Sequence, residues 1–109
     1  AGYQCGYIGK WHLASGPGNF AKRAVPHERR GGYNDYWLAA DALEMTSHGY
    51  GGYMFRGDGS RVEWDTETYR VDAQAEYLLD YLSHVSADRP FFIFASFLEP
   101  HHQNDRSRF

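Results

Sequence analysis

Phe91-Phe-Ile-Phe-Ala-Ser-Phe-Leu98 decides the fold, because it is an uncharged run of strand length that closely follows a helical pattern. Between about Thr68 and Val85, apolar residues recur at the spacing of one helix face, which predicts a helix with that face against a core. The repeating positions are Val71, Ala75, Leu78, Leu79, Leu82 and Val85. A helix that leads into a buried strand is the repeating unit of parallel α/β sheets. The sequence therefore predicts an α/β fold with a mostly parallel sheet flanked by helices.

A second strand is predicted near the start of the chain, over Cys5 to Lys10. Lys10 and His12 stand two residues apart in Gly6-Tyr-Ile-Gly-Lys-Trp-His-Leu13, so an extended backbone would place both on the same side. A fixed cation beside a titratable imidazole is suited to binding an anion. The apolar run that ends at Leu98 likewise leads into a polar cluster that begins with His101. Strands whose carboxyl ends line a site commonly end in this way.

The middle of the chain is rich in glycine and in aromatic residues. Residues 14–32 and 49–60 predict irregular loops, and a short helix is expected from about Trp37 to Thr46, with Asn34 or Asp35 as its cap. Aromatic residues make up 17% of the chain, including nine Tyr and three Trp. Such loops could form sugar-binding subsites, or their aromatic side chains could pack against the rest of a larger protein.

Composition limits the classes of partner. The chain has 109 residues and a net charge of −3 with interspersed signs, which argues against a nucleic-acid surface. No apolar stretch approaches the length of a membrane span, and the single cysteine cannot form an internal disulfide. The length suffices for one small domain but is less than a multi-layer hydrolase needs. The chain is therefore expected to be an internal part of a larger catalytic domain.

Both ends of the chain resemble the sulfatases of the alkaline-phosphatase-like superfamily. Ala1-Gly-Tyr-Gln-Cys-Gly-Tyr-Ile-Gly-Lys-Trp-His-Leu13 is similar to the family signature Gly-Tyr-x-Thr-Gly-Tyr-x-Gly-Lys-Trp-His-Leu. Pro90-Phe-Phe-Ile-Phe-Ala-Ser-Phe-Leu-Glu-Pro-His101 is similar to a later strand that ends in Pro-His, and Gly31-Gly-Tyr-Asn-Asp-Tyr-Trp37 is similar to an aromatic stretch between them. The resemblance implies an α/β sulfatase catalytic domain that hydrolyses a sulfated carbohydrate or a related sulfate ester.

The resemblance also implies roles for three residues. Lys10 is similar to the lysine that binds the sulfate group, and His12 to the histidine that takes a proton at the nucleophile. His101 is similar to the histidine that neutralises the departing alkoxide. From the residues alone, Lys10 requires either a carboxylate or a bound anion near the end of an apolar strand. His12 alone would more often be a hydrogen-bonded structural histidine.

Four further residues are weaker candidates for contact with substrate. The family pattern often continues Pro-His-x-Pro, whereas this chain continues with His102, Gln103 and Asn104, which either contact substrate or cap a loop. His48 could reach the site from the middle of the chain, but the sequence favours a surface or structural histidine.

A metal site at His101, His102 and Asp105 is disfavoured. Adjacent residues of an extended segment point in opposite directions, and nothing in the sequence marks a fourth ligand. No metal site is therefore expected within this chain.

The nucleophile of the family is absent from this sequence. Sulfatases use a cysteine that is converted to formylglycine within Cys/Ser-x-Pro-x-Arg, and no such motif occurs here. Cys5 is followed by Gly6-Tyr-Ile-Gly9 and stands where the family usually has Thr. The family's calcium ligands also lie outside the matched span. Residues 1–109 are therefore expected to be a partial catalytic domain, completed by the remainder of a parent protein that supplies formylglycine and calcium.

Two alternative functions stay open. Phosphate or phosphonate ester hydrolases of the same superfamily act on groups with similar oxygens, and a non-catalytic carbohydrate-binding or scaffold module would need no nucleophile. The family resemblance alone suggests a periplasmic, secreted or lysosomal parent.

Overall fold

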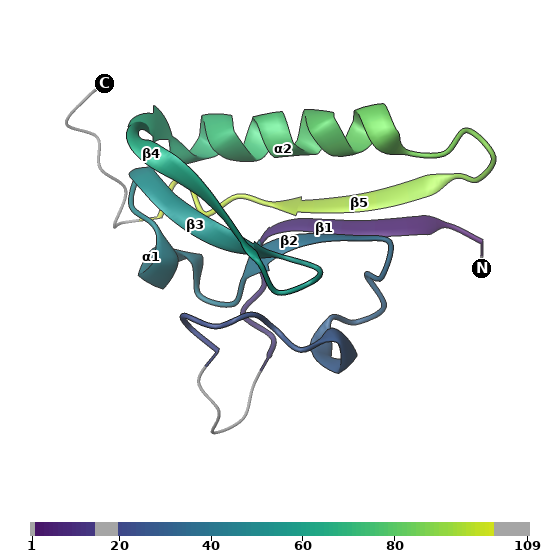
Figure 1. Ribbon diagram of the computed structural model, residues 1–109, viewed down its shortest axis with the longest axis horizontal. Coiled ribbons are helices and arrows are strands. Elements are labelled where there is room, and N and C mark those ends of the chain that lie inside the picture. The colour runs from purple at the N-terminus through teal and green to yellow at the C-terminus, as the bar shows by residue number, and fades with distance from the viewer. Residues whose placement is uncertain (1, 15–19, 102–109) are drawn as a thin grey trace.

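The computed structural model describes residues 2–14 and 20–101, which form an α/β unit around a five-stranded sheet (Figure 1). The strands are β1 (Gln4–Lys10), β2 (Tyr36–Ala40), β3 (Tyr50–Arg56), β4 (Arg61–Tyr69) and β5 (Phe91–Ser96). The helices are η1, a 3-10 helix (His27–Arg29), α1 (Leu43–Thr46) and α2 (Arg70–His84). Within the described residues, no helix combines the length and apolar character needed to cross a membrane.

The sheet is mixed, and its strand order is β4-β3-β2-β1-β5. β1 is parallel to both of its neighbours, β2 and β5, whereas β2 with β3 and β3 with β4 are antiparallel. The α/β class is thus as the sequence predicts, but a sheet that is mostly parallel is not what forms, because the β3–β4 hairpin adds an antiparallel half. The three parallel strands end at one common edge of the sheet.

The structure confirms the three elements with the strongest sequence patterns. The segments predicted as strands near both ends of the chain form β1 and β5, which pair directly from Gln4 with Phe91 to Gly9 with Ser96. The predicted helix forms as α2 and packs against β1, β3 and β4. Figure 1 shows α2 running alongside the sheet for most of the length of β5.

The face that α2 turns to the sheet is not the predicted one. Leu79 and Leu82 are 65% and 38% exposed, while the buried positions of the helix are Arg70, Ala73, Gln74 and Tyr81. Hydrogen bonds from two polar residues of the helix account for this orientation. Gln74 Nε2 donates to the carbonyl oxygen of Ser96 at 3.2 Å, and Arg70 binds a carboxylate beyond the end of β5. These bonds fix the rotation of the helix and leave part of its leucine stripe exposed.

The helix predicted from Trp37 to Thr46 is wrong in its first half. Tyr36–Ala40 forms β2, buried between β1 and β3, and only Leu43–Thr46 is helical. A strand enclosed in this way reads as a continuous apolar run without alternation. Asp35 caps no helix; its carboxylate instead accepts a hydrogen bond from the Cys5 amide at 2.8 Å.

The predicted loop over residues 49–60 is also wrong, because most of it forms β3. Two of its glycines lie within the strand: Gly51 and Gly52 have φ values of 81° and 151°, and a Cβ at Gly52 would lie 2.3 Å from Ser47 Cβ. The pairing register shifts between Tyr50 and Gly52 at this point. In residues 14–32, by contrast, the described part is irregular apart from η1, as predicted.

Two hydrophobic clusters lie on opposite faces of the sheet, and alternate residues of β2 supply both. Leu38 and Ala40 join the cluster under α2, which also holds Leu43, Met54, Trp64, Ala73 and Leu98. Trp37 and Ala39 join the other cluster, with Tyr7, Ala14 and Val25. Both faces of β2 are therefore held in place by packing.

We predict that Gly9→Ala destabilises the fold far more than Gly32→Ala. Both glycines have a positive φ, 117° and 94°, but a Cβ at Gly9 would lie 1.9 Å from the backbone oxygen of Ser96, whereas a Cβ at Gly32 would meet nothing within 4 Å. The backbone strain alone costs about 1–2 kcal/mol. The added clash should bring the loss at Gly9 to about 4 kcal/mol or more. Urea denaturation followed by circular dichroism measures both losses, and equal values would contradict the close approach of β5 to β1.

Candidate functional site

The candidate residues follow the carboxyl ends of the three parallel strands. β1 ends at Lys10, which is in register with Ala40 at the end of β2, and Gly9 is in register with Ser96 at the end of β5. His12 follows β1 by two residues, and His101 follows β5 by five. The three parallel strands thus end at one edge of the sheet, where α1 also lies (Figure 1), and Lys10, His12 and His101 stand at or after two of these strand ends.

Lys10 is neutralised by Glu44 of α1. The Lys10 Nζ and Glu44 Oε1 atoms are 2.9 Å apart, and the two side chains are 19% and 16% exposed. A carboxylate is one of the two partner types that the sequence left open for this lysine. An anion that binds Lys10 must therefore compete with, or sit beside, an existing negative charge.

His12 lies beyond the end of β1 and does not have an extended backbone. β1 ends at Lys10, and His12 has a φ of 59°, so the predicted alternation along an extended strand does not extend to it. A left-handed conformation in a residue other than glycine costs about 1–2 kcal/mol and is more common at functional sites. His12 is exposed, and it lies near enough to Glu44 for its protonated form to lower the pKa of that carboxyl.

The pKa of the Glu44 carboxyl is set by opposing effects. Burial raises this pKa, but the hydrogen bond from Lys10, a backbone hydrogen bond and the charges of Lys10 and His12 together outweigh burial and hold it below the ordinary value of 4.5. Glu44 is therefore ionised at neutral pH and links the two candidate residues of the first motif.

A buried ion pair holds the segment that carries His101. Arg70, the first residue of α2, is 2% exposed, and its Nε and Nη2 atoms lie 2.8 and 2.5 Å from Glu99 Oε2. Glu99 stands two residues before His101, whose amide donates to the Leu98 carbonyl at 3.1 Å and closes the turn. Removing one partner of such a pair leaves a buried charge without compensation, at a cost of about 3–5 kcal/mol.

Residues of and beside α1 join the two ion pairs. Arg70 Nη1 donates to Ser47 Oγ at 3.0 Å, and this hydroxyl donates to the Leu43 carbonyl at 2.7 Å. Because Glu44 holds the end of β1 and Ser47 holds the start of α2, this short segment connects the strand ends. Lys10, Glu44, Ser47, Arg70 and Glu99 are called the carboxyl-edge network below.

Each carboxylate of the carboxyl-edge network has one oxygen that accepts no hydrogen bond from a described residue. Glu44 Oε2 and Glu99 Oε1 are buried and have no hydrogen-bond partner among the described residues. An acceptor left in this state costs free energy unless water or a ligand supplies a donor. The two acceptor oxygens can each take a hydrogen bond from a donor, whereas an oxyanion at this edge would depend on Lys10 and on protonated histidines for attraction.

The remaining candidates are not gathered at this edge. His48 is exposed and lines a separate cavity of about 440 Å³ with Tyr50 and Trp64, and none of Lys10, His12 and His101 lines that cavity. His102, Gln103 and Asn104 lie outside the described residues. Among the residues that the structure does describe, no group of three or more His, Cys, Asp or Glu side chains could hold a metal ion.

Sequence reasoning missed the carboxyl-edge network apart from Lys10. Arg70 carried a usable signal, since a cation at the N-terminus of a helix opposes the helix dipole and calls for a partner elsewhere. Glu44 and Glu99 carried none, because their partners are 34 and 29 residues away.

A scan against protein-family models found no match, and a search of curated proteins also found none. Membership of the sulfatases is therefore a hypothesis that rests on the motifs.

We predict that Lys10→Met raises the pKa of Glu44 from its lowered value in the native chain. In the native chain the depressed pKa means that the ionised Glu44 stabilises the fold above about pH 4.5, and this contribution is lost as the pH falls through the lower, folded-state value. Without the lysine, burial remains and favours the neutral acid. Carboxyl ¹³C NMR titration measures the midpoint.

Asp58 provides the control for this titration. Hydrogen bonds from Ser60 lower the pKa of this exposed carboxyl, so it should not respond to the loss of Lys10. A Glu44 midpoint that does not rise in Lys10→Met would show that Lys10 is not what holds this carboxylate.

Proposed function

We propose that this chain is part of the catalytic domain of a sulfatase, which hydrolyses a sulfuric ester of a carbohydrate or a related compound. The observation that carries the proposal is the pairing of β1 with β5. These two parallel neighbours contain the two motifs that resemble the family. The polar residues of each motif follow the carboxyl end of its strand, and the two strands end at the same edge of the sheet. In the proposed site, residues some ninety positions apart in the sequence act on one substrate.

The proposed roles follow from charge and proton chemistry. Lys10 neutralises charge on the transferring sulfuryl group, and an imidazolium at His101 donates a proton to the oxygen of the departing alcohol. His12 accepts a proton on the side of the nucleophile. Glu44 holds the ammonium of Lys10 near the end of β1 before substrate arrives.

The nucleophile is proposed to come from outside these residues, as formylglycine in the parent protein, together with calcium. The described residues offer no cluster for calcium, so no step is assigned to it here. The apolar edge strand supports a larger domain: Phe91, Phe92 and Phe94 of β5 are all exposed, and among the described strands β5 pairs with β1 alone. Long apolar edges are normally covered.

Activity measurements on the parent protein test the proposal. We expect the parent to carry a Cys/Ser-x-Pro-x-Arg motif and to release sulfate from a sulfated sugar and from 4-nitrophenyl sulfate, while residues 1–109 alone show no turnover. His101→Ala should slow the sugar ester by about 10²–10⁴-fold, because an alkoxide is a poor leaving group that needs the proton. The loss with 4-nitrophenyl sulfate should be much smaller.

The controls separate the alternatives. His84→Ala changes an exposed histidine at the end of α2 and should leave both rates unchanged. Equal losses on the two esters in His101→Ala would remove His101 from the acid role. Faster hydrolysis of 4-nitrophenyl phosphate than of the sulfate would favour a phosphate or phosphonate ester hydrolase, and a parent without the motif or turnover would favour a binding module.

A further inference from the structure

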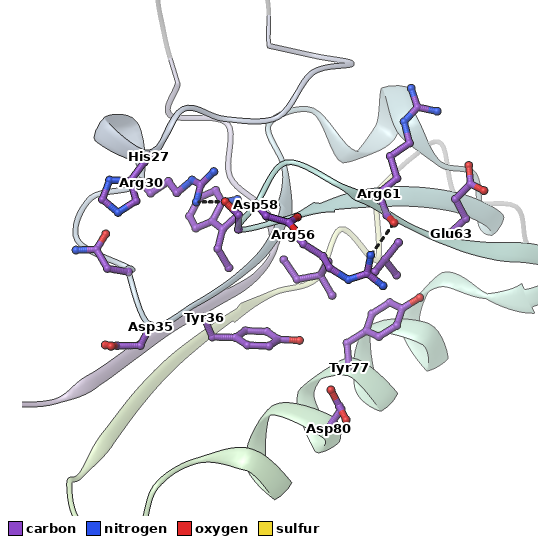
Figure 2. Close-up of a pocket in the computed structure, with 15 residues that line it drawn as sticks. His27, Arg30, Asp35, Tyr36, Arg56, Asp58, Arg61, Glu63, Tyr77 and Asp80 are labelled. Atoms are coloured by element: carbon purple, nitrogen blue, oxygen red, sulfur yellow. Dashed lines mark hydrogen bonds between the residues drawn. The ribbon is translucent and has the colours of Figure 1, made fainter.

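A cavity of about 860 Å³ lies between the amino-terminal half of β2 and the tip of the β3–β4 hairpin (Figure 2). It exists because β3 pairs with β2 only at Leu38 and Ala39, so the hairpin leaves the start of β2 uncovered on that side. Residues from the loop before β2, the hairpin tip and α2 complete its walls. None of Lys10, His12 and His101 lines the cavity, which lies toward the opposite end of β2 from them.

Two tyrosines and an arginine face this space in a fixed arrangement. Tyr36 packs against Tyr81 with ring centroids 4.7 Å apart, and Figure 2 shows the Tyr36 hydroxyl directed toward Tyr77. The guanidinium of Arg56 lies above Tyr77, where hydrogen bonds from Nη1 to the Arg61 carbonyl at 2.9 Å and to Ser60 Oγ at 3.2 Å hold it. Its Nε and Nη2 atoms bond to no other described residue and remain available to a ligand.

The charges around the cavity are nearly balanced. Four carboxylates and three arginines line it, and His27 adds a titratable group; the carboxylates are Asp35, Asp58, Glu63 and Asp80. An anion would be repelled by the carboxylates, and a cation would be repelled by the arginines. A ligand with many uncharged hydroxyl groups can instead accept from the guanidinium and donate to the carboxylates.

Aromatic rings beside paired donors and acceptors are the features that recognise a sugar, which has both an apolar C–H face and a ring of hydroxyls. Burial raises the pKa of Tyr36 and of Tyr77, so both keep their hydroxyl protons at neutral pH. The volume falls within the range of small-molecule sites. We propose that this cavity binds one or two units of an uncharged saccharide. The inference stands apart from the proposed sulfatase function, since it invokes neither a nucleophile nor a sulfate group.

Titration of the ¹⁵N-labelled 109-residue chain with maltose, cellobiose and lactose tests this proposal. At least one of the three sugars should shift the amide signals of residues 36–38, 56–63 and 77–80, with a dissociation constant on the order of 1–10 mM. Arg56→Ala should weaken binding about tenfold or more, because a hydrogen bond to a charged group is lost. Arg56 is exposed, so this variant should stay folded.

A matched pair on α2 supplies the control. Asp80→Asn changes a cavity carboxylate, and Asp72→Asn makes the same change on the same helix outside the cavity. Binding should weaken in the first variant alone. The proposal is overturned if none of the three sugars shifts the cavity residues up to about 50 mM, well above these constants. Equal affinities in the two aspartate variants, or in Arg56→Ala and the native chain, would also overturn it.

Discussion

Arg70 brings a full positive charge into the interior of the protein, and its neutralisation by Glu99 is the interaction on which the carboxyl edge depends. The guanidinium makes three hydrogen bonds to two groups: two of its nitrogens bind one carboxylate oxygen of Glu99, and the third binds the Ser47 hydroxyl. Desolvating such a pair is expensive, so its value lies in the geometry that it imposes. The ion pair joins the first residue of α2 to the segment after β5. Arg70 also binds Ser47, which follows α1 and bonds to the Leu43 carbonyl.

β1 is the other half of this arrangement. As the only strand with two parallel partners in the described sheet, it sets the positions at which β2 and β5 end. Gly9 permits β5 to approach it closely, and Glu44 holds the lysine that follows. The proposed sulfate site and the proposed saccharide cavity are thus consequences of one strand arrangement, located toward opposite ends of β2.

Sequence reasoning predicted the elements whose signals are local. β1, β5 and α2 carry apolar runs or helical spacing that no neighbour needs to complete. β2 was misjudged because its Ala-Ala end leads into good helix formers, and β3 because Gly51 and Gly52 are typical of loops. The burial of β2 and β3 depends on pairing partners elsewhere in the chain, and the strand propensity of a segment gives no information about those partners. The buried face of α2 was misjudged for a related reason, since Gln74 and Arg70 bind groups 22 and 29 residues away.

The candidate site was predictable only in part, for the same physical reason. Lys10, His12 and His101 stand in recognisable motifs, and parallel pairing brings those motifs to one edge. Glu44 neutralises the charge of Lys10, and nothing in the motif around Lys10 indicates this partner. The cavity residues come from several separate segments, and none of these segments is unusual in composition on its own.

Sulfate titration of the 109-residue chain tests most directly whether one site contains Lys10, His12 and His101. The imidazole signals of His12 and His101 would be followed by NMR at constant ionic strength, with His84 as an exposed reference. The account predicts that His12 and His101 shift with a single dissociation constant, that Glu44→Gln tightens this binding by removing the competing charge, and that His84 does not respond. Different midpoints for the two histidines, a response from only one of them, or an affinity that is unchanged in Glu44→Gln would contradict it.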